Sequence, residues 1–229
     1  MEKTRILVWD LPVRVFHWLL AGSFTVAFLT AEAENWRNLH VAFGYAFVAL
    51  LGFRLLWGFM GSRHARFSSF AYGPRRVLAY LRSMMAGKPE HHIGHNPAGG
   101  WAIFAMILLG IAVGASGLAM GYTAGGEWIE ELHEGLSFAM LGLVVVHVLG
   151  VIVGSLLHGE NLVGSMLTGY KRGASDSAIR GSQRVVAAAL VVAVGATFGW
   201  ALTSPQAQLV VAKAKAEGGE RGHKDHDDD

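Results

Sequence analysis

The sequence of 229 residues contains no cysteine and little charge. Without cysteine it can form no disulfide, no thiolate metal site and no iron–sulfur cluster, and it lacks the Cys-x-x-Cys-His motif that attaches haem covalently. Charged residues make up 16% of the chain, and 52% is hydrophobic. Soluble domains carry about 25% charged residues, so this composition excludes an ordinary soluble domain and indicates a membrane protein.

The few charges leave long uncharged stretches. Residues 15–31 and 135–159 carry no formal charge. A helix needs about 20 apolar residues to cross a hydrocarbon core, and these runs do not alternate as the strands of a membrane barrel do. The sequence therefore predicts an all-α membrane protein with five spanning helices, at about residues 15–31, 39–60, 101–122, 132–157 and 185–203.

Lysine and arginine predict the orientation, because cytoplasmic loops carry an excess of both. The segments on one side hold Lys3, Arg5, Arg14, Arg63, Arg66, Arg75, Arg76, Arg82, Lys88, Lys171, Arg172, Arg180 and Arg184. The short loops on the other side hold Arg37 with Glu32, Glu34, Glu127, Glu130 and Glu131. We expect a retained, cytoplasmic N-terminus, because no signal-peptide cleavage pattern follows the first span, and a C-terminus on the opposite side.

Two segments outside the spans have recognisable patterns. Pro74 followed by Val77, Leu78, Tyr80 and Leu81 predicts a short amphipathic helix on the inner membrane surface, ending at Gly87 or Pro89. The polar residues 213–229 are predicted to be a disordered tail. Its His223 and His226 are either solvated or bind a divalent metal weakly together with the aspartates.

Six histidines lie in or beside the spans: His17, His40, His95, His133, His147 and His158. An ionisable residue inside a membrane span is costly to bury and is a functional candidate for that reason. His133 and His147 lie on the fourth span, fourteen residues apart. That separation places them about 21 Å apart and within roughly 40° of the same helix face.

Each of these two histidines has a partner at matching depth. His40 opens the second span near the outer side and His17 opens the first span near the inner side. The sequence thus predicts the pairs His40/His133 and His17/His147, each able to supply both axial ligands to one non-covalently bound, b-type haem. Small residues near these positions either make room for haem or pack the helices closely: Gly22, Gly44, Gly135, Gly142, Gly150 and Gly154.

The remaining polar groups allow alternatives. We expect His158 at the inner surface, as a propionate or interfacial contact rather than a ligand, and His95 in a turn that caps the third span rather than as a ligand or quinone contact. His64, His91 and His92 are expected to be solvated. Arg54 could pair with a haem propionate or snorkel to the inner surface. No His-Glu-x-x-His motif, no glycine-rich nucleotide loop and nothing that predicts a nucleic-acid partner is present.

Several motifs together resemble one family. They are WDLPVRVFHW at residues 9–18, RLLWGF at 54–59, GHNPAGG at 94–100, and the stretch from His133 to His147 followed by HGEN at 158–161. The sequence resembles the bacterial cytochrome b561 and nickel–iron hydrogenase cytochrome b family over about residues 5–172. The resemblance implies a bacterial inner-membrane protein with a four-helix domain at 1–172 that binds two b haems through His17, His40, His133 and His147, and quinone exchange near the membrane surface. Residues 173–212 would add a fifth helix with its flanks, and 213–229 the tail.

Three functions are compatible with these features. The leading hypothesis is an electron-transfer subunit of a respiratory chain, working between a quinone such as ubiquinone or menaquinone and a redox partner. That partner would be a hydrogenase or dehydrogenase subunit, or a cytochrome c. The alternatives are a stand-alone oxidoreductase, for example from superoxide to quinone, and a haem-free metal transporter that uses the membrane histidines.

Overall fold

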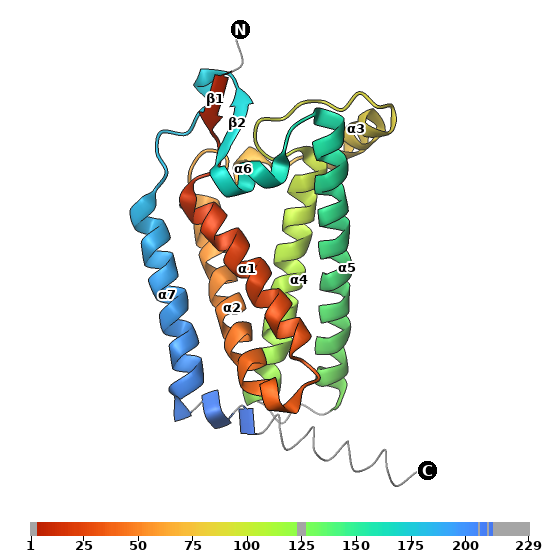
Figure 1. Cartoon of the computed structure of the whole chain (residues 1–229). Coiled ribbons are helices and arrows are strands. Elements are labelled where there is room, and N and C mark those ends of the chain that lie inside the picture. Colours follow the sequence, from red (N-terminus) through yellow and green to blue (C-terminus); the bar gives the residue numbers. More distant parts are fainter. Residues whose placement is uncertain (1–3, 123–126, 206, 210, 213–229) are drawn as a thin grey trace.

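The chain is an all-α membrane protein, and the computed structural model describes residues 4–122, 127–205, 207–209 and 211–212 (Figure 1). Five of its helices are long and apolar enough to span a bilayer, which confirms the spans predicted from the sequence. These are α1 (Leu11–Leu29), α2 (Arg37–Met60), α4 (Pro97–Tyr122), α5 (Glu127–His158) and α7 (Arg184–Thr203). The tail predicted at 213–229 lies outside the described residues.

The first helix begins earlier than its apolar run. Asp10 is the N-cap of α1 and accepts a hydrogen bond of 2.8 Å from the amide of Val13, and Pro12 lies in the first turn. The second carboxylate oxygen of Asp10 accepts a hydrogen bond of 3.1 Å from the Trp57 indole, near the end of α2. One buried carboxylate therefore fixes the start of α1 against the end of α2.

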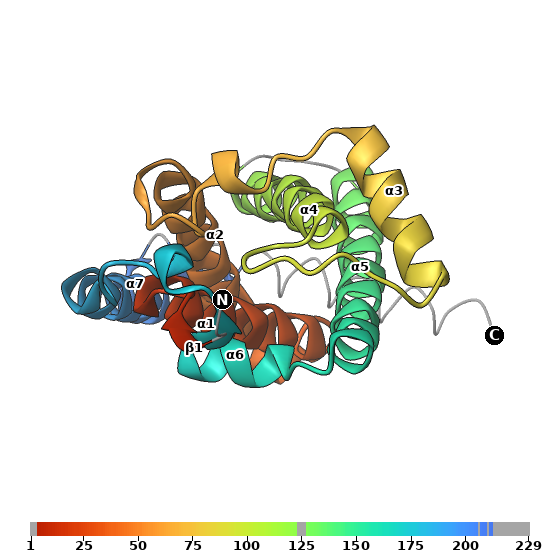
Figure 2. The ribbon, with the colours of Figure 1, turned by 90° about the horizontal axis from the view of Figure 1, so that it is seen from above.

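Four spanning helices form a bundle and the fifth lies outside it. The helix α1 packs on α2, α2 on α4, and α4 on α5, whereas α7 packs on the far side of α2 and α1, away from α5 (Figure 2). Four buried side chains from α2, α4 and α5 form one cluster in the middle of the bundle: Phe47, Leu51, Val113 and Met140. This cluster is the hydrophobic core on which the bundle closes.

Short elements that the spans do not predict close one end of the bundle. Strand β1 (Thr4–Leu7) pairs antiparallel with β2 (Tyr170–Gly173), which follows the short helix α6 (Leu162–Thr168). The carbonyl of Gly169 accepts hydrogen bonds from the amides of Val8 and Trp9. Gly169 has φ +89°, and a Cβ atom there would lie 2.8 Å from the Trp9 carbonyl oxygen, so this junction requires glycine.

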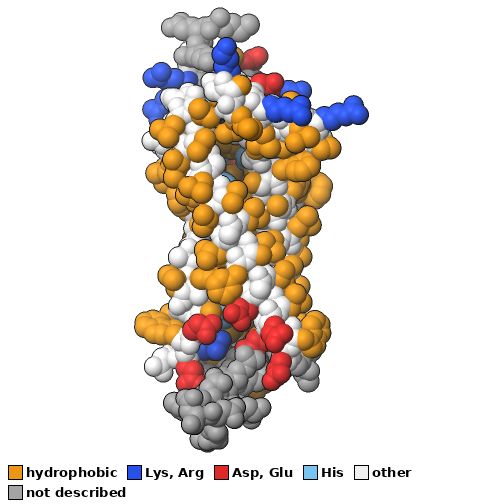
Figure 3. All heavy atoms as spheres, turned by 90° about the vertical axis from the view of Figure 1, so that its right-hand side faces the viewer, with side chains coloured by type: hydrophobic (Ala, Val, Ile, Leu, Met, Phe, Trp, Pro, Cys, Tyr) orange, Lys and Arg blue, Asp and Glu red, His pale blue; other side chains and the backbone are white. Residues whose placement is uncertain are grey.

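The two ends of the molecule differ in charge. Lysine and arginine side chains gather at the end that carries β1, β2 and α3 (Pro74–Met85), and carboxylates gather at the other end, with a hydrophobic belt between them (Figure 3). We call these the basic end and the acidic end. The helix α3 lies where the sequence predicts an amphipathic helix, and three 3₁₀ turns connect the longer elements: Glu34–Trp36, Phe67–Ser69 and Ser175–Ser177.

Candidate functional site: two histidine pairs in the bundle

The pair nearer the acidic end is formed by His40 of α2 and His133 of α5. Their ring centroids lie 6.2 Å apart and the ring planes cross at 81°. Gly117 of α4 backs the pair, because a Cβ atom at that position would lie 3.0 Å from Cε1 of His133. The absence of a side chain at Gly117 therefore lets the His133 ring lie against α4.

Backbone carbonyls fix the orientation of both rings in this pair. His40 Nδ1 lies 2.8 Å from the carbonyl oxygen of Ala27, and His133 Nδ1 lies 3.1 Å from that of Val113. A carbonyl can only accept, so each Nδ1 carries the proton and donates it, and each Nε2 is left with a lone pair. This is the arrangement that metal-binding histidines adopt, with the outer nitrogen held by a second group.

The pair nearer the basic end is formed by His17 of α1 and His147 of α5. Their ring centroids lie 6.5 Å apart with an interplanar angle of 54°. His17 Nδ1 is buried and has no hydrogen-bond partner among the residues that the structure describes. A buried, unpaired imidazole nitrogen is costly, and binding of a metal to the ring offsets part of that cost.

Both separations fit a metal held between two imidazoles. Imidazole nitrogens bind metals such as zinc at about 2.0–2.1 Å, so two rings on opposite sides of one metal ion have centroids about 6 Å apart. Gly44, one turn after His40, also leaves room, because a Cβ atom there would meet no other atom within 4 Å. The donor set is two neutral nitrogens per site, which suits haem iron. That these histidines bind iron stays a prediction.

The central core separates the two pairs. Met140 lies midway between His133 and His147 on α5, and it belongs to the buried cluster with Phe47, Leu51 and Val113. At about 1.5 Å per residue, each histidine of α5 is about 10 Å along the helix from Met140. The two pairs are therefore separated along the bundle by the packed core.

Arg54 is buried, which the snorkelling alternative did not predict. Its side chain is 4% exposed, and it donates a hydrogen bond of 3.2 Å to the carbonyl of Ala65. Its guanidinium lies 4.7 Å from the ring centre of Phe67 and 5.8 Å from that of Phe70. A loop folded back over the end of α2 thus encloses this cation and satisfies it with a carbonyl and aromatic faces.

His95 is enclosed by aromatic rings rather than forming a cap. Its ring centroid lies 4.6 Å from that of Trp9 and 4.5 Å from that of Phe70. Its Nδ1 is buried and finds no hydrogen-bond partner in the described part of the chain. Asn96 caps α4 instead, by accepting a hydrogen bond of 2.7 Å from the amide of Gly99. Burial, and then the charges of Arg54 and other neighbours that include His147, lower the pKa of His95 to about 3, so its ring is neutral.

A polar cavity lies at the basic end beside His95. It has a volume of about 300 Å³. Its lining consists of Arg63, His64, Ser69, Tyr72, His92, Ile93, Gly94 and His95. His64 was expected to be solvated, but it is 8% exposed and its Nε2 donates a hydrogen bond of 2.9 Å to the carbonyl of Ser177, and burial lowers its pKa. No local signal in the sequence indicates this burial, because it depends on distant segments.

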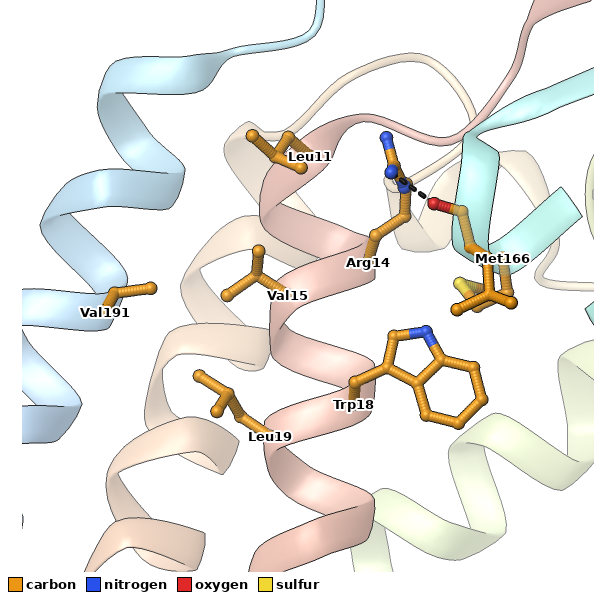
Figure 4. A pocket seen from close by; sticks show the side chains of 8 residues that line it. Leu11, Arg14, Val15, Trp18, Leu19, Met166 and Val191 are labelled. Carbon is orange, nitrogen blue, oxygen red and sulfur yellow. Dashed lines mark hydrogen bonds between the residues drawn. The ribbon is translucent and has the colours of Figure 1, made fainter. Parts of the chain in front are cut away.

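A second pocket is an apolar groove on the outside of the bundle. It measures about 280 Å³ and lies between α1, α6 and α7, with Trp18, Leu19 and Val191 in its wall (Figure 4). Arg14 is the charged residue in its lining, and its guanidinium donates a hydrogen bond to the carbonyl of Leu167. The groove thus offers an apolar surface to the membrane and no group suited to redox or acid–base chemistry.

His158 and His91 lie outside both pairs. His158 is the last residue of α5, and its Nε2 lies 3.4 Å from the hydroxyl of Tyr80. Its ring centroid lies 5.8 Å from that of His91. Within the described part of the chain, no group of three or more histidine, aspartate or glutamate side chains is placed to hold a metal ion.

Comparison with known proteins gives one family. The model of the prokaryotic cytochrome b561 family matches residues 8–169. A probable Ni/Fe-hydrogenase B-type cytochrome subunit of Rhodobacter capsulatus is 25% identical over 217 residues, which cover 74% of this chain and 82% of the relative. The probable Ni/Fe-hydrogenase 1 B-type cytochrome subunit of Escherichia coli K12 is 24% identical over 213 residues, 72% of this chain and 89% of the relative. No solved structure matches.

Proposed function

Because the chain belongs to the prokaryotic cytochrome b561 family, we propose that this membrane cytochrome b passes electrons between a quinone and a redox partner through two b-type haems. The observation that carries the proposal is the presence of two histidine pairs, one towards each end of the bundle. The ring centroids within the two pairs lie 6.2 Å and 6.5 Å apart. We assign His40 and His133 to one haem and His17 and His147 to the other. Bound haem supplies one-electron chemistry, and the protein supplies ligands, orientation and environment.

The residues around the pairs have distinct tasks in this proposal. The carbonyls of Ala27 and Val113 hold the Nδ1 protons of His40 and His133, which would leave each Nε2 free to bind a haem iron and would strengthen it as a donor. Arg54, a buried cation at the basic end, is our candidate partner for a haem propionate, because guanidinium matches a carboxylate. We propose residues 1–172 as the haem-binding domain and 173–212 as an accessory segment, since α7 lies outside the bundle and beyond the family match.

We further propose that the basic end faces the cytoplasm of a bacterium. The excess of arginine and lysine at that end supports it, because cytoplasmic loops of membrane proteins carry this excess. The protein would then lie in the inner membrane, with its N-terminus in the cytoplasm and the end of α7 on the opposite side. The acidic end, with the His40/His133 pair, would face the redox partner.

The relatives guide the choice of partner. Those matched are named as subunits of Ni/Fe hydrogenases, so we propose a hydrogenase or a similar dehydrogenase, with a cytochrome c as the alternative acceptor. A stand-alone reaction from superoxide to quinone stays open. The hypothesis of a haem-free metal transporter loses its support, because the family is one of cytochromes.

Transfer across a membrane tests the function directly. We propose reconstituting the chain with haem into vesicles that enclose ferricyanide, and adding a short-chain quinol outside. The expected result is reduction of the enclosed ferricyanide at a rate that depends on the protein. Vesicles with the His40→Ala variant are the matched control. This variant is expected to keep the fold and lacks one of the proposed haem ligands on the electron path. If the haems are reduced but ferricyanide is not, the chain does not carry electrons across the membrane.

We propose that quinone binds in the polar cavity at the basic end. The cavity of about 300 Å³ is lined by His95, whose Nδ1 has no partner among the described residues and can donate a hydrogen bond to a quinone carbonyl. The hydroxyls of Ser69 and Tyr72 already donate to backbone carbonyls. The variant His95→Phe keeps the aromatic packing and removes the ring nitrogens. Loss of one hydrogen bond predicts a KM for decylubiquinone that is roughly 2- to 12-fold higher.

Two controls accompany this variant. His91→Phe changes an exposed histidine of the same loop and should leave the KM as it is. The haem content of both variants should equal that of the unaltered chain, because neither residue belongs to a pair. An unchanged KM in His95→Phe would show that the quinone binds elsewhere.

A further inference from the structure

The helix α3 is attached to the bundle by one side only. It lies across the ends of the spanning helices at the basic end, at the edge of the molecule beyond α5, and it packs against α4 (Figures 1 and 2). It follows the end of α2 and precedes the start of α4, which places it at the surface of the bilayer. Its free side therefore faces outward at the level where lipid headgroups begin.

The apolar arc of α3 is divided between protein and surroundings. Val77 is 6% exposed and Tyr80 is 1% exposed, and both face the bundle. Leu78 is 55% exposed, Leu81 41% and Met85 89%. At about 100° per residue these three lie within about 60° of one another, so they form one continuous stripe that the protein does not cover.

Two arginines line one edge of this stripe. Arg75 and Arg82 are exposed and lie next to Leu78 and Met85 on the helix circumference. Residues 61–89 contain no aspartate or glutamate, whereas Arg63, Arg66, Arg75, Arg76, Arg82 and Lys88 carry positive charge. The ion pairs found among the described residues join Glu90 to His92 and Glu160 to Lys171, so neither neutralises an arginine of α3.

We propose that α3 is an interfacial helix that binds acidic phospholipids of the leaflet at the basic end. Leu78, Leu81 and Met85 insert between the acyl chains, and Arg75 and Arg82 contact the phosphates. A bilayer fits this surface better than a soluble protein does, because the stripe is apolar, its rim is cationic and its place is the bilayer surface. The buried side of α3 reaches the polar cavity, since the ring centroid of Tyr80 lies 5.7 Å from that of His92.

Depth measurement tests the insertion. The chain has no cysteine, so a single cysteine accepts a nitroxide label at one position. In haem-loaded full-length protein in bilayers that contain phosphatidylglycerol, a label at Leu81→Cys should be accessible to oxygen and protected from a water-soluble nickel chelate. A label at Ala79→Cys, on the other side of α3, should be accessible to the chelate. A label at position 81 that is open to the chelate, or shielded from both reagents by protein, overturns the proposal.

Lipid preference tests the role of the arginines. The probe is phosphatidylglycerol with a nitroxide on its acyl chain, in phosphatidylcholine vesicles that contain the protein. The unaltered chain should bind it several-fold more tightly than labelled phosphatidylcholine, and the double variant Arg75→Gln, Arg82→Gln should lose most of this preference. The control double variant Arg172→Gln, Arg180→Gln removes the same amount of charge elsewhere at the basic end. It should keep the preference for phosphatidylglycerol. Equal losses in both double variants would overturn a specific role for α3.

Discussion

Replacing His147 with alanine is expected to leave one haem per chain, held by His40 and His133, and replacing His40 should leave the other. In the proposed assignment each haem would be held by one histidine from each of two helices, and the alanine would remove one of the two. The expected measurement is a ratio of two haems per unaltered chain and one in each variant, from reduced-minus-oxidised spectra and the protein concentration. Redox titration of each variant should then show a single step.

The independence of the sites makes this result informative. The buried cluster of Phe47, Leu51, Val113 and Met140 lies between them, so a change at one site should not reach the other. His158→Ala is the matched control, because it removes a histidine of α5 that lies outside both pairs. This variant should retain both haems. Two haems in His147→Ala would show that another residue is the ligand. A haem-free unaltered chain would overturn the assignment of both sites.

The spans and the histidine pairs leave marks that can be recognised in the sequence. An uncharged run of about 20 residues reflects the thickness of the bilayer, and helix geometry converts residue separation into depth and direction. His133 and His147 could therefore be matched with His40 and His17 before any contact was known. The start of α1 at Leu11 is also predictable from Asp10 as N-cap and Pro12 in the first turn. The predicted span begins at residue 15 instead, because the uncharged apolar run begins there.

The basic end could not be predicted in this way. Strands β1 and β2 are four residues each and lie just outside the two ends of the family match, and neither has a pattern long enough to recognise. His64, His95 and Arg54 lie in or beside a loop rich in arginine, which reads as solvated. Their burial results from this loop folding over the end of α2, and only the tertiary structure contains that information.

Replacing the buried Asp10 with alanine is expected to destabilise the chain strongly. Asp10 is fully buried. It caps α1, accepts from the indole of Trp57, and is the carboxylate whose charge acts on buried Arg54. Loss of the cap costs about 1 kcal/mol and an unpaired indole about 1–3 kcal/mol. The charge of Asp10 also acts on Arg54 from beyond ion-pair distance, so its loss should add to the destabilisation.

A graded series separates these contributions. Asp10→Asn keeps one acceptor oxygen for the amide of Val13, but it removes the charge and puts an NH2 donor where an oxygen accepts from the Trp57 indole. Its midpoint of thermal unfolding, followed by circular dichroism and by haem release in one detergent, should lie between those of the unaltered chain and Asp10→Ala. Asp176→Asn makes the same change at an exposed carboxylate and should leave the midpoint unchanged. If Asp10→Asn is also without effect, neither the charge of Asp10 nor its bond to Trp57 stabilises the fold, and Arg54 depends on another group. A haem propionate is the group that our assignment of Arg54 supplies, and Arg54→Leu should in that case shift the potential of the haem at the basic end.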